Sequence, residues 1–262
     1  MHVSRLSRTL LAFLLWAAAL YVLLCVALLV FQRSLIYFPQ PRAIDNPNTL
    51  LKLPIEDAEV LVSTRPLEGR NALIYLGGNG EDVSLNLPEF SQAFSDHALY
   101  LLHYRGYGGS SGSPSEEAIQ ADALALFDLV YAQHPCTVVV GRSLGSGVAV
   151  RLASQRPAAR LILITPYNSI QELAQSRFPY IPVQWLLKDK FESWKYAQQI
   201  RVPTLLIAAE QDQVIPRAST DALFGHFTQG VAALKVIPAA GHNSLSQRPE
   251  YLALLKGGLC KG

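Results

Sequence analysis

The chain has 262 residues, half of them hydrophobic, and a formal net charge of +2 at pH 7. This length fits one α/β domain with a large core and a short appendage. The small charge and the lack of a long basic run argue against a nucleic-acid-binding protein. Three cysteines (Cys25, Cys136 and Cys260) are too few for a disulfide scaffold and lack metal-ligand spacing, and the sequence leaves open whether Cys136 and Cys260 pair.

An uncharged apolar segment occupies the amino-terminal part of the chain. Residues 10–31 contain no charged side chain, and a helix of that length can cross the roughly 30 Å hydrocarbon core of a bilayer. A cleaved signal peptide has an apolar core of only about 7–15 residues and then a small-x-small site, which is missing here. The sequence therefore predicts an uncleaved single-pass anchor, with residues 1–38 forming a tail, the span and a juxtamembrane stretch.

The charges that flank this segment give a weak orientation signal. Arg5 and Arg8 precede it, and Arg33 and Arg42 follow it. Because the amino-terminal tail is short, we expect it to lie in the cytoplasm. The domain then lies on the non-cytoplasmic side of the membrane.

Residues 39–262 show the alternation of an α/β domain. After a proline-rich entry, residues 58–63 alternate weakly and could form an early edge strand. Apolar runs predict further strands at residues 72–76, 98–102, 136–140, 161–164, 204–208 and 233–237. Because helical stretches separate these buried runs, we expect a mostly parallel, doubly wound sheet with helices on both faces.

The strand at residues 136–140 runs directly into Gly141-Arg142-Ser143-Leu144-Gly145 and then a helical pattern. In this strand–turn–helix context a Gly-x-Ser-x-Gly match predicts a nucleophile elbow. The Ser143 hydroxyl is then exposed at the carboxyl end of the sheet, and the Leu144 N–H points toward any oxyanion formed there. The alternative is a serine in a glycine-rich connection that only packs helix on strand.

A serine nucleophile needs a base and a carboxylate, which on such a fold follow in the order Ser, acid, His. His242 follows the last predicted strand, and both Glu210 and Asp212 follow the strand before it. The glycine-rich loop after residues 72–76 predicts a second oxyanion donor, the backbone N–H of Asn79. Taken singly, Asp212 and His242 could each be an ordinary turn or loop residue.

Several motifs resemble the membrane-anchored branch of the α/β-hydrolase superfamily, the small serine hydrolases called α/β-hydrolase domain-containing proteins. The matching segments are residues 32–39, 105–108, 111–116, 141–145, 212–216 and 241–243. The resemblance implies an α/β-hydrolase fold, a single-pass anchor and hydrolysis of acyl esters or thioesters of lipids or acylated proteins. It also selects Asp212 over Glu210, because the family's acid stands at this spacing from a Val/Ile-Pro pair.

The sequence departs from the family pattern in two segments. The oxyanion loop of the family is usually His-Gly-Asn-Ala-Gly, whereas here Gly77 replaces the His, Gly80 the Ala and Glu81 the last Gly. His103 stands where an acid usually precedes Tyr-Arg-Gly. Neither segment supplies a triad group, but the first predicts that the oxyanion loop is supported in a different way.

Residues 166–200 form a longer excursion before the strand at residues 204–208. Its aromatic and aliphatic residues, interrupted by prolines, predict a short helical cap over the active site, with Trp185 and Leu186 bordering an acyl-chain pocket. An ordinary core helix is the alternative.

Together these features predict a membrane-anchored serine hydrolase that works through an acyl-enzyme, with Ser143, His242 and Asp212 as its triad. This chemistry needs neither a metal nor an organic cofactor. The expected partners are a lipid or other acyl substrate and the membrane. A serine peptidase of the same fold and a catalytically silent scaffold are the alternatives, and the sequence does not define the acyl chain, the leaving group or the oligomeric state.

Overall fold

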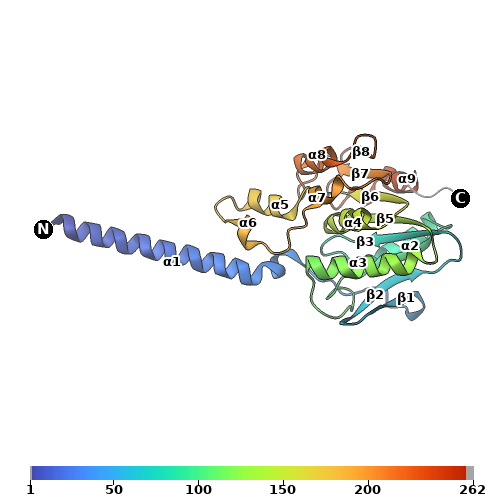
Figure 1. The fold of residues 1–262 in the computed structure, drawn as a ribbon, viewed down its shortest axis with the longest axis horizontal. Coiled ribbons are helices and arrows are strands. Elements are labelled where there is room, and N and C mark those ends of the chain that lie inside the picture. The colour runs from blue at the N-terminus through green and yellow to red at the C-terminus, as the bar shows by residue number, and fades with distance from the viewer. Residues whose placement is uncertain (1, 258–262) are drawn as a thin grey trace.

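The computed structural model describes residues 2–257, in which a long helix, α1 (His2–Ile36), leads into an α/β domain (Figure 1). Among these residues one eight-stranded sheet has the order β1-β2-β4-β3-β5-β6-β7-β8. The strands are β1 (Leu50–Ile55), β2 (Ala58–Arg65), β3 (Asn71–Leu76), β4 (Ala98–Leu102), β5 (Cys136–Arg142), β6 (Arg160–Ile164), β7 (Thr204–Ala209) and β8 (Ala232–Ile237). The helices after α1 are α2 (Leu87–Ala93), α3 (Glu116–Tyr131), α4 (Leu144–Gln155), α5 (Ile170–Arg177), α6 (Val183–Leu186), α7 (Ser193–Ala197), α8 (Arg217–His226) and α9 (Pro249–Gly257).

In the sheet order, all strand pairs from β4 to β8 are parallel, whereas the β1–β2 and β2–β4 pairs are antiparallel. The prediction of a mostly parallel, doubly wound sheet is therefore confirmed. The carboxyl ends of β5, β7 and β8 share one edge of the sheet, so the loops that follow these strands meet there.

The strand predicted at the edge, residues 58–63, is part of β2, which lies second from the edge of the sheet. β2 pairs with β4 on one side and with β1 on the other, and β1 is the true edge. Sequence reasoning missed β1 because Pro54 interrupts its pattern. Pro54 lacks a donor N–H, and an edge strand tolerates such a residue because its outer side needs no partner.

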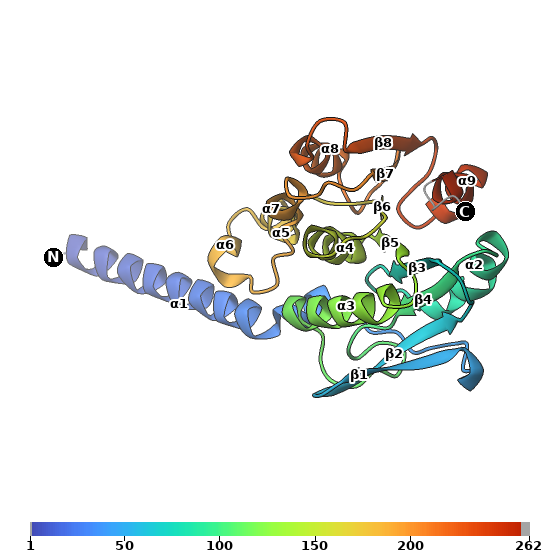
Figure 2. The same cartoon turned by 45° about the vertical axis from the view of Figure 1, so that its right-hand side comes forward.

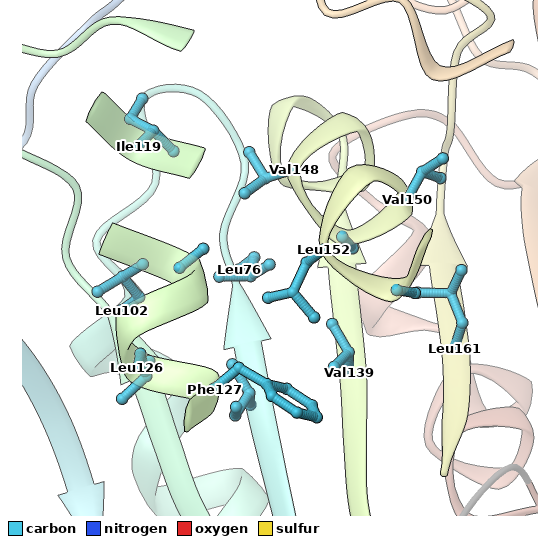
Figure 3. Packing of buried hydrophobic residues seen from close by; sticks show 14 of the residues in the cluster. Leu76, Leu102, Ile119, Leu126, Phe127, Val139, Val148, Val150, Leu152 and Leu161 are labelled. Carbon is cyan, nitrogen blue, oxygen red and sulfur yellow. The ribbon is translucent and has the colours of Figure 1, made fainter. Parts of the chain in front are cut away.

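Alternate side chains of the central strands enter two separate cores. In β3, Ile74 and Leu76 pack toward the core beneath α3, α4, α7 and α8, while Leu73 and Tyr75 pack toward the core beneath α2 and α9. The turned view in Figure 2 shows the two helical layers on opposite faces of the sheet. Figure 3 shows Leu76 and Phe127 within the first core, between α3, α4 and the strands.

The excursion at residues 166–200 divides into two parts. Helices α5 and α6 lie outside the sheet layers, near the end of α1 (Figures 1 and 2). Helix α7 packs on α4 and α8, and its Ala197 is completely buried. Both interpretations of this segment therefore apply, each to a different part of it: α7 is a core helix, and α5 and α6 occupy the position expected of a cap.

Helix α1 extends away from the domain. Its portion Arg8–Ile36 is 29 residues long, with a mean hydropathy of 2.8 in its most apolar window, and that window is not buried at all. Length and composition suffice for one membrane span. Contacts with the rest of the chain come from the carboxyl-terminal half of this helix, from Tyr21 onward (Figures 1 and 2).

The turn between β5 and α4 requires glycine at two positions. A Cβ on Gly145 would lie 2.0 Å from the carbonyl oxygen of Leu76, and one on Gly141 would lie 2.4 Å from the carbonyl oxygen of Gly145. Both contacts are with backbone atoms, which cannot rotate away. Helix α4 therefore approaches β3 and β5 as closely as backbones allow.

We predict that Gly145→Ala lowers the free energy of unfolding by about 2–3 kcal/mol, because the added methyl group overpacks a rigid contact. Thermal unfolding of the full chain in detergent measures the change. Gly225→Ala is the matched control, since a Cβ there meets nothing within 4 Å and Ala favours the helix by up to about 1 kcal/mol. Equal melting temperatures for the two variants would contradict the close approach.

Candidate active site

Ser143 stands in the turn between β5 and α4 with a strained backbone. Its φ of 48° and ψ of −116° lie in a region that side-chain-bearing residues rarely adopt. The Ser143 N–H donates to the Ile164 carbonyl at 2.9 Å, and Ser146 returns two hydrogen bonds to the Ser143 carbonyl. These hydrogen bonds hold the turn in its strained conformation. Strained backbone of this kind is found mainly at functional sites.

Three side chains from three separate loops are joined at the carboxyl edge of the sheet. His242 Nε2 lies 3.0 Å from the Ser143 hydroxyl oxygen, and His242 Nδ1 lies 2.9 Å from Asp212 Oδ2. Asp212 follows β7 and His242 follows β8. Their side chains are only 5% and 10% exposed, so the pair is shielded from water.

The carboxylate determines which imidazole nitrogen carries the proton. An ionised carboxylate can only accept, so His242 Nδ1 donates to Asp212. In the neutral ring Nε2 is then an acceptor facing the Ser143 O–H. The arrangement leaves the hydroxyl hydrogen-bonded to a base.

Asp212 is held in its ionised form. Burial alone raises the pKa of its carboxyl group, but the hydrogen bond from His242 lowers it. The N–H groups of Ile215 and Val214 add to the lowering, at 2.8 and 2.9 Å from Oδ1. The net pKa lies below its ordinary value, so Asp212 stays charged near neutral pH.

Glu210 and the other described histidines lie in other surroundings. Glu210 accepts the Ala239 N–H at 2.8 Å and is exposed. His103 is buried and bonded to Ser63, and burial lowers its pKa to about 4, which keeps it neutral. The remaining partners are Asp96 for His97, Tyr100 and Gly69 for His134, and the ring of Trp194 for His226. Of Asp212 and Glu210, only Asp212 lies against His242.

The loop after β3 is held by the side chain of Asn79. Its Oδ1 accepts the Phe38 N–H at 3.0 Å and the Tyr107 hydroxyl at 2.8 Å, while its Nδ2 donates to the Ile36 carbonyl. With the side chain held in this way, Asn79 lines the same cavity as Ser143 and Leu144. Among the described residues, no turn or loop hydrogen bond takes up the backbone N–H of Asn79 or of Leu144.

Glu81, at a position where the family usually has glycine, supports this loop through hydrogen bonds. It accepts the Gly78 N–H at 2.5 Å, the Tyr75 hydroxyl at 2.8 Å and the Asn86 amide at 2.7 Å. Arg142, directly before Ser143, lies 3.4 Å from Glu81. Through this ion pair Arg142 links the turn at Ser143 to the loop at Asn79. The sequence alone could not reveal this contact.

A cavity of about 320 Å³ opens beside Ser143. Its apolar wall comes from α5, α6, the loop after β7 and the end of α1, with Leu28, Leu35, Ile36, Ile170, Leu173, Phe178, Ile181, Val183, Leu186, Leu187, Val214 and Ile215 among its lining residues. Leu186 lines it as expected. Trp185 does not, and its side chain is 82% exposed. Neighbours on the α6 turn point about 100° apart, so Val183 and Leu186 face inward together and Trp185 faces out.

Sequence reasoning missed a set of contacts between α1 and the loop after α6. Gln32 donates to the Leu186 carbonyl at 3.1 Å and accepts the Lys188 N–H at 2.7 Å. The buried Asp189 carboxylate accepts hydrogen bonds from Arg33 Nε at 3.0 Å and from the Tyr37 hydroxyl at 3.1 Å. These three residues of α1 and its end, Gln32, Arg33 and Tyr37, belong to the motif at residues 32–39. In the sequence this motif indicated only a resemblance to the family.

No group of three or more His, Cys, Asp or Glu side chains that could hold a metal ion occurs within residues 2–257. Cys25 lies within α1 as a free thiol. The question of a Cys136–Cys260 pair involves Cys260, which lies outside the described residues.

Relatives and solved structures resemble most of the chain. A family profile described as "Serine aminopeptidase, S33" matches residues 89–197. An uncharacterised protein of Mycobacterium tuberculosis is 32% identical over 240 residues, which are 84% of this chain and 82% of that protein. Protein bem46 of Schizosaccharomyces pombe is 27% identical, over 76% of this chain and 70% of its own length.

A lipase and an esterase are also similar to the chain. Lysophosphatidylserine lipase ABHD12 of Xenopus tropicalis is 34% identical over 182 residues, 60% of this chain and 46% of that protein. The structure of the Pyrococcus furiosus esterase Pf2001 superposes with a TM-score of 0.65, 17% identity and coverage of 84% of this chain and 95% of that one. At that identity the likeness shows the shared α/β-hydrolase fold, which confirms the predicted fold class.

We predict that Arg142→Met lowers the free energy of unfolding by about 1–3 kcal/mol, because it leaves the largely buried Glu81 carboxylate without its ion-pair partner. Adding Glu81→Gln to Arg142→Met should recover part of that loss, since the amide buries no charge. Urea unfolding of the two single variants and the double variant measures the coupling. Strictly additive effects would show that the ion pair contributes nothing.

Proposed function

The chain belongs to the α/β-hydrolase family, and from that premise we propose that it is a membrane-anchored serine hydrolase that cleaves carboxylic esters or thioesters. The observation that carries the proposal is the continuous chain of hydrogen bonds from Ser143 through His242 to Asp212. A lone serine hydroxyl is a weak nucleophile at neutral pH. His242 Nε2 lies 3.0 Å from the Ser143 hydroxyl oxygen, and the buried Asp212 carboxylate orients the ring, so His242 can take up the hydroxyl proton as Ser143 attacks.

In the acylation step the Ser143 oxygen attacks the carbonyl carbon of the substrate while His242 Nε2 accepts the hydroxyl proton. The imidazolium that forms is stabilised by Asp212, which remains ionised. Negative charge develops on the carbonyl oxygen, where the N–H groups of Asn79 and Leu144 would receive it. His242 then returns the proton to the leaving alcohol or thiol.

In the second step water takes the place of the departed group. His242 removes a proton from the water as it attacks the acyl-Ser143 carbonyl, and the same two N–H groups hold the second oxyanion. Collapse releases the carboxylic acid and restores the Ser143 hydroxyl. Within this scheme Glu81 and Arg142 are positioning residues, because they act on the loop and the turn rather than on the substrate.

The lining of the cavity favours an acyl substrate over a peptide with a free amino terminus. An aminopeptidase needs a carboxylate close to the scissile bond to pair with the ammonium group of its substrate. No Asp or Glu is among the described residues that line the cavity, where leucine, isoleucine and valine dominate. This composition supports esters or thioesters of apolar acids, although the matching family profile is described as an aminopeptidase.

We propose that α1 anchors the domain in a membrane, because its exposed apolar surface has no protein to cover it. Arg33, at the domain end of the span, is paired with Asp189. The location of the domain on the non-cytoplasmic side stays a prediction from the sequence.

We predict that full-length protein hydrolyses p-nitrophenyl butyrate, and that Ser143→Ala and Asp212→Asn each lower kcat by about 10⁴-fold or more. Initial rates in detergent micelles measure both. Glu210→Gln is the matched control, since this neighbouring carboxylate contacts only the Ala239 N–H in the described hydrogen bonds and its variant should keep kcat within about twofold.

Two results would refute the assignment. Folded Ser143→Ala that retains wild-type hydrolysis would exclude Ser143 as nucleophile, and Glu210→Gln as damaging as Asp212→Asn would move the acid. Cleavage of aminoacyl arylamides in preference to the butyrate ester would favour the peptidase. A folded protein that cleaves neither substrate would favour the silent scaffold.

A further inference from the structure

The cavity beside Ser143 is closed on one side by the membrane helix itself. Leu28, Gln32, Leu35 and Ile36 of α1 line it, opposite the wall formed by α5 and α6. Ser143, Leu144 and Asn79 lie at its inner end. Helix α1 therefore forms part of the cavity wall and is more than a tether for the domain.

The end of α1 is fastened to both sides of the cavity. On one side Gln32 bonds to the backbone of Leu186 and Lys188, and Arg33 bonds to Asp189. On the other side Asn79 bonds to the backbone at Ile36 and Phe38. The last turns of α1 thus hold the cap and the loop after β3 in a fixed relation, and the cavity lies between them.

The length of α1 places this wall at the membrane surface. At about 1.5 Å per residue, the 29 residues of Arg8–Ile36 extend about 44 Å, against about 30 Å for the hydrocarbon core. A core that begins at Arg8 therefore ends near Leu28. The cavity-lining positions of α1 then lie from the edge of the hydrocarbon outward into the headgroup layer.

The cap reaches back along α1 beyond that edge. The Tyr21 hydroxyl donates to the Tyr180 carbonyl at 2.7 Å, and Tyr21 lies seven residues, about 10 Å of helix, before Leu28. The side chains of Tyr180 and Trp185 are 88% and 82% exposed. On this geometry Tyr180 lies about 10 Å inside the hydrocarbon edge, so we expect the exposed aromatic side chains of the cap to face lipid.

We propose that the acyl chain of a lipid ester in the bilayer enters the cavity sideways along α1, and that Leu28 and Leu35 determine which acyl-chain lengths fit. This inference rests on the proposed hydrolase function and deepens it by naming the route of the acyl chain and the residues that select it. The chain leaves the hydrocarbon between α1 and the cap, and its carbonyl carbon reaches Ser143 at the inner end of the cavity. The apolar wall replaces the lipid tails around the chain, so the acyl group is not exposed to water during transfer.

The test compares Leu28→Trp with Val30→Trp in full-length protein reconstituted into phosphatidylcholine vesicles. Leu28 faces the cavity, whereas Val30, two residues away on α1, is 64% exposed and does not line it. The measured quantity is kcat/KM for a palmitoyl ester divided by kcat/KM for a butyryl ester. Filling the cavity at Leu28 should lower this ratio about tenfold, which corresponds to the lost burial of about two methylene groups.

Val30→Trp should leave the ratio at its wild-type value. If Leu28→Trp fails to fold, Leu35→Trp tests the same wall two turns along the helix. Equal ratios for the cavity-facing and lipid-facing variants, or a wild-type preference for the butyryl ester, would overturn the inference. Failure of the proposed function gives a different result, because wild-type protein would then hydrolyse neither ester.

Discussion

The backbone of α4 meets the backbone of β3 with no room for a side chain at Gly145, and the geometry of the site depends on this contact. A Cβ at Gly145 would lie 2.0 Å from a β3 carbonyl oxygen. The helix must therefore start immediately after β5, which forces Ser143 into its positive-φ turn and exposes the hydroxyl at the sheet edge. The same approach brings the first N–H of α4 toward the loop that follows β3. One packing constraint thus sets both the position of the nucleophile and half of the proposed oxyanion site.

A second set of contacts connects this site to α1. Asn79 holds its loop against the end of α1, and Gln32 and Arg33 hold the cap to the same helix. The proposed site is therefore completed by a segment that composition alone would describe as a tether. Removing α1 would remove one wall of the cavity and Arg33, one of the two side-chain partners of Asp189, so α1 and the domain form one structural unit.

The sequence predicted the features that depend on local pattern. Apolar β-branched runs marked the parallel strands, and the order of Ser143, Asp212 and His242 matched their loops at one sheet edge. It could not predict features that depend on partners far along the chain. Asp189 reads as an ordinary loop acid until Arg33 and Tyr37, more than 150 residues earlier, are seen against it. The orientation of α6 was equally hidden: both Trp185 and Leu186 were predicted to border the pocket, but only Leu186 faces the cavity, and Trp185 faces outward.

Arg142 and Glu81 illustrate the same distinction. In the sequence Arg142 is one residue of the Gly-x-Ser-x-Gly match and Glu81 is a departure from the family pattern, but only their 3.4 Å approach shows that they support each other. The loss of the usual loop histidine at Gly77 is accompanied by a hydrogen bond from the Tyr104 hydroxyl to the Gly77 carbonyl at 2.9 Å. The loop is thus held both by Tyr104, which belongs to the family's Tyr-Arg-Gly segment, and by Glu81, which departs from the family pattern.

The most direct test of the proposed triad is to locate the reactive nucleophile by chemistry. Full-length protein in detergent is treated with a fluorophosphonate, digested and analysed by mass spectrometry. If Ser143 is the activated nucleophile, we expect one phosphonylated peptide, modified at Ser143, whose formation slows sharply in Asp212→Asn. A folded protein that stays unmodified, or an adduct on a different serine, would contradict the central claim that Ser143 is the activated nucleophile.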